Sequence, residues 1–114
     1  MAEKILVVDD EALILTAVER ALSKVGYSIS RAQNMKELED AVKGAPFDLL
    51  ITDIYMQEGS IKEIVEMVKR TSPSVKILMM SGSFNKNVAE NFIEKPFSIE
   101  ALRKRVKEIL HEPS

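Results

Sequence analysis

Cysteine and tryptophan are both missing from this chain, and histidine occurs once, as His111. Without cysteine the chain can form neither a disulfide framework nor a thiolate metal site. The absence of disulfides fits a reducing compartment such as the cytoplasm. His111 falls in the last turn of an expected helix, where an imidazole interacts favourably with the helix C-terminus. We therefore expect no phosphotransfer role for it.

A surplus of positive charge and long apolar runs are also missing. Lys and Arg number 16 against 18 Asp and Glu, a formal net charge of −2, so no basic field attracts nucleic acid or an anionic membrane. No apolar run approaches the ~20 residues of a membrane-spanning helix, and the start of the chain lacks signal-peptide features. We expect one cytoplasmic domain over residues 1–114 that binds neither nucleic acid nor membranes.

Short apolar runs rich in β-branched residues occur at residues 5–8, 49–51 and 75–80. Such runs are typical of strands buried on both faces of a parallel sheet. Residues 28–32 form a more polar run, which predicts a strand nearer an edge. Residues 92–94 complete a set of five expected strands.

Helical patterns separate these runs. Apolar residues recur at helical spacing over residues 14–25, and Gly26 supplies a stop. Ser or Asn followed by Glu three positions later predicts helix starts at Asn34 and Ser60. Ser98 can cap the last helix, whose apolar stripe begins at Ile99. Strands alternating with helices indicate an α/β fold. We expect a flavodoxin-like, doubly wound, five-stranded parallel sheet in the order 2-1-3-4-5.

Polar side chains follow the expected strands where each strand ends. Asp9 and Asp10 follow the first strand and Asp53 the third, while Ser81 follows the fourth and Lys95 the fifth. In an open α/β sheet, functional sites form beyond the carboxyl ends of the strands. We therefore expect these side chains to converge on one edge of the sheet.

Three carboxylates brought together in this way repel one another, and a divalent cation relieves the repulsion. Mg²⁺ prefers oxygen ligands and binds through one or two carboxylates plus a phosphate. One carboxylate can then act as a nucleophile towards phosphorus. Mg²⁺, the Lys95 ammonium and the Ser81 hydroxyl would neutralise charge on the transferring group. For Glu11 we expect a helix-start role and not metal binding.

The segments at these strand ends match a known family as a set. They are Leu-Val-Val-Asp-Asp-Glu at residues 6–11, Leu-Leu-Ile-Thr-Asp-Ile-Tyr-Met at 49–56, Met-Met-Ser-Gly at 79–82 and Lys-Pro-Phe at 95–97. In this order they make the chain similar to the receiver domains of two-component response regulators, over essentially its whole length.

The resemblance implies a role for each matching residue. Asp53 would be the phosphoacceptor, and Asp9 and Asp10 the acidic pair that binds Mg²⁺ together with Asp53. The Tyr55 carbonyl would be a further Mg²⁺ ligand. Ser81 matches the switch Ser/Thr of the family, and Lys95 matches its active-site lysine. Phe92, three residues before Lys95, matches the rotameric aromatic switch.

The resemblance also implies partners and a mode of action. A histidine kinase or histidine phosphotransfer protein would supply the phosphoryl group, and a downstream protein would read the conformational switch. The domain would phosphorylate itself and slowly remove its own phosphoryl group, which makes it a signalling domain and not an enzyme acting on other substrates. In this family the bond before the proline at position 96 is commonly cis.

Two segments depart from the family pattern. The run Gln-Glu-Gly at residues 57–59 is a shortened loop that lacks the usual proline. Residues 83–91 must replace a full fourth helix; nine residues make ~2.5 turns at best, and three of them are asparagines, which favour turns. We expect the fourth helix to be shortened or absent. Because that helix belongs to the family's usual dimer face, we expect a monomer that dimerises only weakly.

Three alternatives compete with this hypothesis. A flavodoxin would bind a cofactor phosphate after its first strand, where Asp9, Asp10 and Glu11 repel it. A haloacid-dehalogenase-type phosphatase would have Asp-x-Asp there. A pseudo-receiver, which has the same fold but only binds proteins, stays open. Simpler roles are also open for single residues: capping for Ser81 and core packing for Phe92.

Overall fold

The computed structural model describes residues 2–54, 59–82 and 91–111. Its five strands are β1 (Lys4–Val8), β2 (Ser28–Ala32), β3 (Leu49–Asp53), β4 (Lys76–Ser81) and β5 (Phe92–Glu94). All pairings are parallel, and the order β2-β1-β3-β4-β5 is the predicted one. The more polar strand β2 lies at an edge, as its composition indicated.

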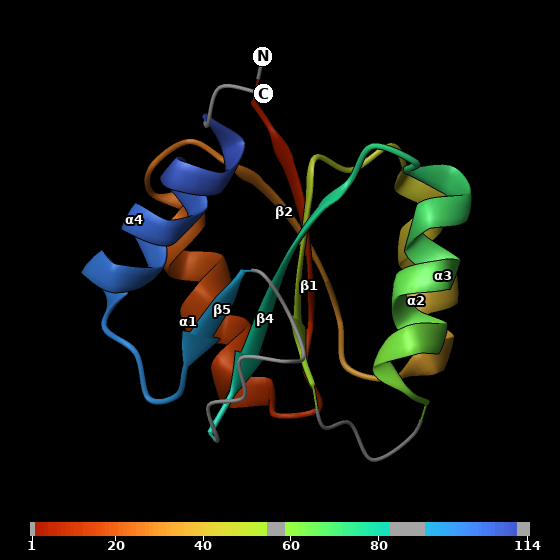
Figure 1. Ribbon diagram of the computed structural model, residues 1–114, viewed down its shortest axis with the longest axis horizontal. Coiled ribbons are helices and arrows are strands. Elements are labelled where there is room, and N and C mark those ends of the chain that lie inside the picture. Colours follow the sequence, from red (N-terminus) through yellow and green to blue (C-terminus); the bar gives the residue numbers. More distant parts are fainter. Residues whose placement is uncertain (1, 55–58, 83–90, 112–114) are drawn as a thin grey trace.

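The helices of the described residues are α1 (Ala12–Ser23), α2 (Met35–Ala41), α3 (Ile61–Thr71) and α4 (Ile99–Leu110), with a 3₁₀ turn, η1, at Val42–Gly44. Helices α1 and α4 cover one face of the sheet and α2 and α3 the other (Figure 1). None of these helices has the length and apolar character that a bilayer crossing requires. The prediction for residues 83–91 falls outside the described residues, apart from Asn91.

The predicted N-caps form as expected. The side chains of Asn34, Ser60 and Ser98 each accept a hydrogen bond from the backbone N–H three residues later. Gly26 ends the α1 region with φ +100°, a conformation that favours glycine. These side-chain acceptors satisfy N–H groups that a helix start otherwise leaves without partners, so the sequence fixes three helix starts locally.

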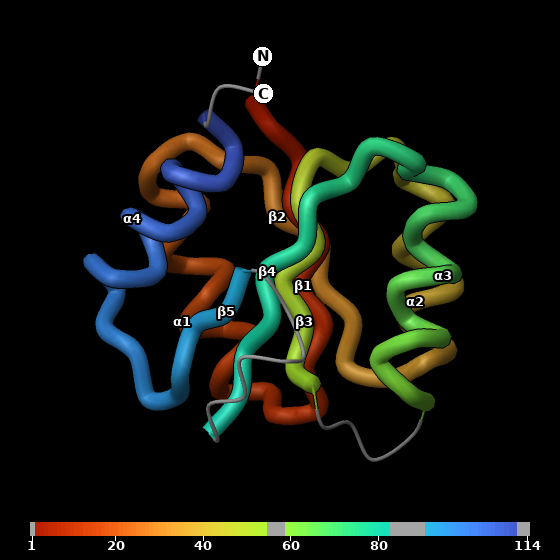
Figure 2. The backbone as a smooth tube through the Cα atoms, viewed as in Figure 1, coloured from red at the N-terminus to blue at the C-terminus, as the bar shows by residue number. Residues whose placement is uncertain are grey.

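The strands are buried on both faces, which explains their continuous apolar character. Ile5 and Val7 point into the core beneath α1 and α4, whereas Leu6 and Val8 point into the core beneath α2 and α3. The strands cross one another in the tube view while the two helix layers stay apart (Figure 2). This two-sided burial fixes the sheet register, because a slip of one residue would exchange the two faces.

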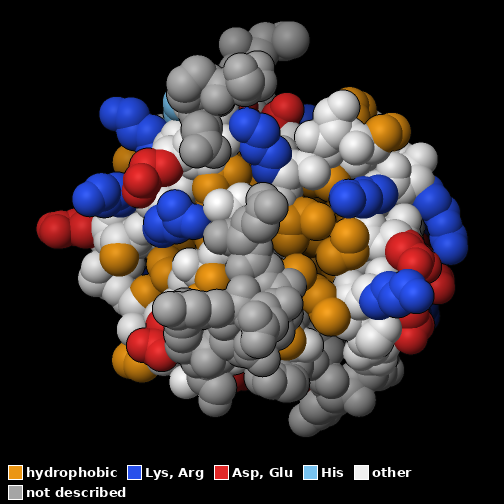
Figure 3. Space-filling model, viewed as in Figure 1, with side chains coloured by type: hydrophobic (Ala, Val, Ile, Leu, Met, Phe, Trp, Pro, Cys, Tyr) orange, Lys and Arg blue, Asp and Glu red, His pale blue; other side chains and the backbone are white. Residues whose placement is uncertain are grey.

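Two apolar residues that the helical spacing assigned to the core lie at the surface. Ile99 is 52% exposed and Val25 is 50% exposed. Ile99 is the first residue of α4, and α1 ends at Ser23, before Val25. Residues at helix ends extend beyond the sheet, so periodicity alone misplaces them. On the opposite side, apolar side chains show between β4 and α3 (Figure 3), where Val65, Met67 and Ile77 are only partly buried.

Candidate functional site

The sheet register places two predicted site residues side by side. Val8 of β1 pairs with Thr52 of β3, so the next residues along each strand, Asp9 and Asp53, are neighbours at the carboxyl edge. Asp53 is the last residue of β3, and its backbone carbonyl accepts a hydrogen bond from the Thr52 hydroxyl at 3.1 Å. The two carboxylates therefore meet because the strands are parallel and in register.

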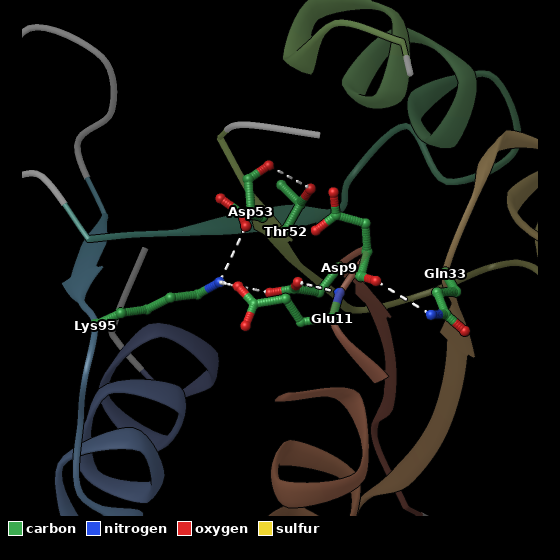
Figure 4. Close-up of polar contacts among 7 residues, drawn as sticks. Asp9, Glu11, Gln33, Thr52, Asp53 and Lys95 are labelled. Atoms are coloured by element: carbon green, nitrogen blue, oxygen red, sulfur yellow. Dashed lines mark hydrogen bonds and ion pairs between the residues drawn. The ribbon is translucent and has the colours of Figure 1, made fainter. Parts of the chain in front are cut away.

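Lys95 follows the edge strand β5, and its side chain reaches Asp9 and Asp53 from there. Ser81 of β4 pairs with Glu94 of β5, and the Lys95 N–H donates to the Ser81 carbonyl at 2.7 Å. The Lys95–Pro96 peptide bond is cis, as the resemblance implied. Lys95 thus starts directly at the end of β5, and its side chain extends towards β1 and β3 (Figure 4).

The Lys95 ammonium joins the carboxylates. Its Nζ atom lies 2.7 Å from Asp9 Oδ2, 3.0 Å from Asp53 Oδ2 and 3.6 Å from Glu11 Oε1 (Figure 4). The Asp9 side chain is fully buried, while the side chains of Lys95 and Asp53 are 13% and 9% exposed. Such a short and largely buried contact is a charge-assisted hydrogen bond and not a loose surface ion pair.

Burial and hydrogen bonding act in opposite directions on the pKa values of two of these groups. Desolvation raises the pKa of the Asp9 carboxylate above its ordinary 3.8, although hydrogen bonds from Lys95 and from the Glu11 N–H act against the shift. For Lys95, desolvation alone would lower the pKa. The hydrogen bonds to Asp9 and Asp53 outweigh it and raise the Lys95 pKa above 10.5. The lysine is therefore held as an ammonium ion.

The acidic group has the chemistry of a site for a hard cation. Carboxylate oxygens of Asp9, Asp10, Glu11 and Asp53 lie within 4.8 Å of one another. An all-oxygen set of this kind suits Mg²⁺ or Ca²⁺ and not a soft metal. Glu11, which we expected only to start a helix, belongs to this group; it also occupies the N-cap of α1 without a side-chain capping bond.

The turn after β2 supports the acidic loop, and no sequence motif predicted this support. The Gln33 side-chain amide donates to the Asp10 carbonyl at 3.1 Å (Figure 4), and the Asp9 N–H donates to the Ala32 carbonyl at 3.2 Å. Asp9 Oδ1 accepts from the Glu11 N–H at 2.9 Å. The only available signal was the position of Gln33 at the carboxyl end of a neighbouring strand.

The remaining predicted residues take different positions. Ser81 is buried at the end of β4, beside Lys95 in the backbone ladder. Phe92 is a partly buried residue of β5. Tyr55 lies outside the described residues, so its role as a ligand stays a prediction. His111 is the C-cap of α4, and its Nε2 lies 3.3 Å from Glu3 Oε2. It does not belong to the acidic group.

Known proteins share both the sequence pattern and the fold. The chain is 28% identical to the DNA-binding transcriptional regulator NtrC of Rhizobium meliloti, over 96% of this chain and 24% of that protein. It is 30% identical to the response regulator protein PilR of Pseudomonas aeruginosa, over 91% of this chain and 25% of that protein. The chain therefore spans about a quarter of the length of these two regulators.

A solved structure agrees with these relatives. The chemotaxis protein CheY4 of Vibrio cholerae superimposes with a TM-score of 0.86 at 28% identity, covering 96% of this chain and 100% of that one. The family model for the response regulator receiver domain matches residues 5–107. The family model and the strand order agree, and the chain belongs to the response regulator receiver domains.

Proposed function

We propose that Asp53 accepts a phosphoryl group and that this modification switches the domain between two signalling states. One observation carries the proposal: the Asp53 carboxylate lies 3.0 Å from the Lys95 ammonium and within the same oxygen cluster as Asp9 and Asp10. A carboxylate nucleophile, a fixed cation and spare acidic ligands are together what phosphoryl transfer to an aspartate requires.

In the proposed reaction an Asp53 carboxylate oxygen attacks phosphorus, and the bond to the donor's leaving group breaks. With a phosphohistidine donor, the P–N bond breaks and the imidazole leaves with its proton. Lys95 follows the negative charge, because its ammonium already contacts Asp53 and pairs with a phosphoryl oxygen once that carboxylate becomes an acyl phosphate. The Ser81 hydroxyl would donate to a second phosphoryl oxygen.

Asp9, Asp10 and Asp53 would hold Mg²⁺, and the carbonyl of Tyr55 is the further ligand that we propose. When bound, the ion neutralises charge on the phosphoryl oxygens. Asp9 suits the role of a Mg²⁺ ligand, because its buried carboxylate has lost much of its hydration and already faces Asp53. The neighbouring Glu11 carboxylate adds negative charge, which favours a dication over a monovalent ion.

We propose the same switch elements as the resemblance implied. The Lys95 N–H donates a hydrogen bond to the Ser81 carbonyl. A movement of Ser81 towards a phosphoryl group would therefore also move the end of β5. Phe92 lies on that strand and is only partly buried, which leaves its ring able to change rotamer. The switch would thus transmit the state of Asp53 to the surface around β4 and β5.

The proposed donor is a histidine kinase or a histidine phosphotransfer protein, and the reader is a downstream protein. We further propose that residues 1–114 act as one cytoplasmic domain that is monomeric, or dimerises only weakly. It would modify only itself and hydrolyse its own acyl phosphate slowly. The pseudo-receiver is the second candidate; the intact set of Asp53, Lys95 and the acidic pair weighs against it.

Intact mass spectrometry after incubation with acetyl phosphate and Mg²⁺ tests the proposal. We expect one added phosphoryl group that requires Mg²⁺, is absent from Asp53→Asn, and persists in the surface variant Asp40→Asn as a matched control. Modification of Asp53→Asn to the same extent would disprove the acceptor. If no mass is added, beryllofluoride titration followed by NMR decides: no shift around Asp53 means a pseudo-receiver, and a shift there means rapid hydrolysis.

A further inference from the structure

Helices α1 and α4 lie side by side on one face of the sheet (Figure 2). Two hollows lie along their junction. The first, of about 190 Å³, lies between the helices. The second, of about 320 Å³, lies where α1 ends and β2 begins. Arg103 lines both. We call these two hollows, which share Arg103, the α1/α4 groove.

The charged groups that line the groove are all basic. Arg20, Lys24 and Arg103 line the first hollow, and Arg103, Lys107 and His111 line the second. Among the described residues, no Asp or Glu lines either hollow. His111, which lines the second hollow, lies 3.3 Å from Glu3. Because the chain as a whole carries −2, this is a local excess of positive charge.

The basic side chains are also available for a partner. In the described part of the chain, Arg20, Lys24 and Lys107 take part in no ion pair. Arg103 is fixed across the groove by its Nε–H, which donates to the Ala21 carbonyl at 2.8 Å. Its guanidinium is therefore already oriented, so a ligand would lose little side-chain entropy in binding it.

Apolar side chains run along the same groove. The exposed large hydrophobic residues of the described chain are Leu13 (86%), Val25 (50%) and Ile99 (52%). Val25 lines the second hollow and Ile99 the first. Leu13 lies one helical turn before Ala17, which also lines the first hollow, so it extends the same side of α1. Exposed apolar residues that gather at one place mark an interaction surface.

We propose that the α1/α4 groove binds an acidic, amphipathic segment of a partner protein, with apolar side chains in the hollows and carboxylates against the basic residues. Charge complementarity selects an acidic partner, and apolar residues beside basic ones suit the spaced anchors of an amphipathic helix. A nucleic acid would leave these apolar residues unused, and the net negative charge of the domain opposes an extended polyanion.

This site goes beyond the proposed phosphorylation. Asp9 and Asp53 lie at the carboxyl edge of the sheet, before the start of α1, whereas Lys24 and Val25 lie after the other end of that helix. Only the apolar end of the groove, at Leu13 and Ile99, lies near that edge, and the basic residues that would hold the partner lie further along the helices. Binding in the groove and phosphorylation at Asp53 can be measured separately, and either can fail without the other.

An NMR titration of the isotope-labelled protein tests the groove. The probe is a synthetic helical peptide of about 14 residues with leucines at helical spacing, flanked by glutamates. We expect saturable shifts confined to α1, α4 and residues 24–27, and affinity that falls with added salt. A peptide in which lysines replace the glutamates should not bind. No saturable shift up to about 1 mM peptide, or shifts centred elsewhere, overturns the proposal.

Charge reversal supplies the matched comparison. The double variant Lys24→Glu and Lys107→Glu should bind the peptide at least about tenfold more weakly than the unaltered protein does. Lys62→Glu with Lys69→Glu makes the same change in net charge on α3, across the sheet, and should bind as the unaltered protein does. Equal loss in both variants overturns the proposal. If the groove resonances shift with protein concentration in the absence of peptide, the occupant is a second copy of the chain. If the protein binds anionic vesicles through the groove, the occupant is a membrane. Either result also overturns the proposal.

Discussion

The side-chain amide of Gln33 donates a hydrogen bond to the backbone carbonyl of Asp10 at 3.1 Å. The contact joins the turn after β2 to the acidic loop after β1. Asp10 contributes a carboxylate to the proposed Mg²⁺ site while its backbone is held by a different strand connection. A residue outside the acidic cluster thus supports one of the proposed ligands through its backbone.

Replacing Gln33 with alanine is expected to weaken Mg²⁺ binding while the fold persists. Loss of one hydrogen bond of this kind costs about 0.5–1.5 kcal/mol, which corresponds to an affinity about 2- to 10-fold weaker. Calorimetric titration with Mg²⁺, without any phosphodonor, measures the effect. Glu39→Ala, an exposed change on α2, is the control and should leave the affinity unaltered. Equal affinities for Gln33→Ala and the unaltered protein would show that Asp10 needs no such support.

Replacing Lys95 with methionine should destabilise the Mg²⁺-free protein by about 3–5 kcal/mol, because it removes one partner of a largely buried pair. The change removes the ammonium and leaves the buried carboxylates of Asp9 and Asp53 facing each other without compensation. Urea unfolding measures the loss, and Lys36→Met on the surface of α2 is the control. Added Mg²⁺ should stabilise the Lys95 variant more than the unaltered protein, since the ion replaces the lost charge. Identical effects of Mg²⁺ on both would contradict this account.

The raised pKa of Lys95 also predicts behaviour in alkali. The pKa in the folded state lies above the 10.5 of the unfolded chain, so the protonated lysine contributes stability that is complete below 10.5. That contribution is lost as the pH rises through the folded-state pKa. The alkaline decline in unfolding free energy should therefore be steeper in the unaltered protein than in Lys95→Met.

Replacing Asp9 with asparagine should stabilise the Mg²⁺-free protein near neutral pH. Burial raises the Asp9 pKa above 3.8, so its charged form is a cost to the folded state that is fully present above the folded-state pKa. As the pH falls towards 3.8 the carboxyl takes up its proton, and the advantage of the variant should shrink. Unfolding curves in EDTA at several pH values measure this, with the exposed change Asp40→Asn as the control. A pH-independent difference would point to packing and not to charge.

Alanine at either of two glycines should reduce stability through the backbone. Gly26 and Gly59 have φ of +100° and +76°, and alanine in this region costs about 1–2 kcal/mol. A Cβ at Gly26 meets no atom within 4 Å, whereas one at Gly59 would lie 2.7 Å from the Met35 sulfur. The Met35 side chain is flexible and can turn aside, so both variants should lose stability of this size in urea unfolding. Gly44→Ala, without a positive φ, is the control and should show the smallest loss.

Much of the fold follows from local patterns. The apolar runs predicted the strands to within a residue or two, because side chains buried on both faces must be apolar throughout. Asn34, Ser60 and Ser98 predicted three helix starts, since capping depends only on residues three apart. The assignment of Ile99 and Val25 to the core was wrong, because periodicity records which side of a helix is apolar but not how far the sheet beneath it extends.

The sequence by itself determined the strands, the helix starts and the residue types that end each strand, because these depend on neighbours along the chain. The tertiary structure alone decided which of those residues meet. Parallel register set Asp9 beside Asp53, and the path of β5 brought Lys95 between them from the far side of the sheet. Gln33 joined the site, and basic residues of α1 and α4 met in one groove, because packing joins residues that no sequence spacing relates.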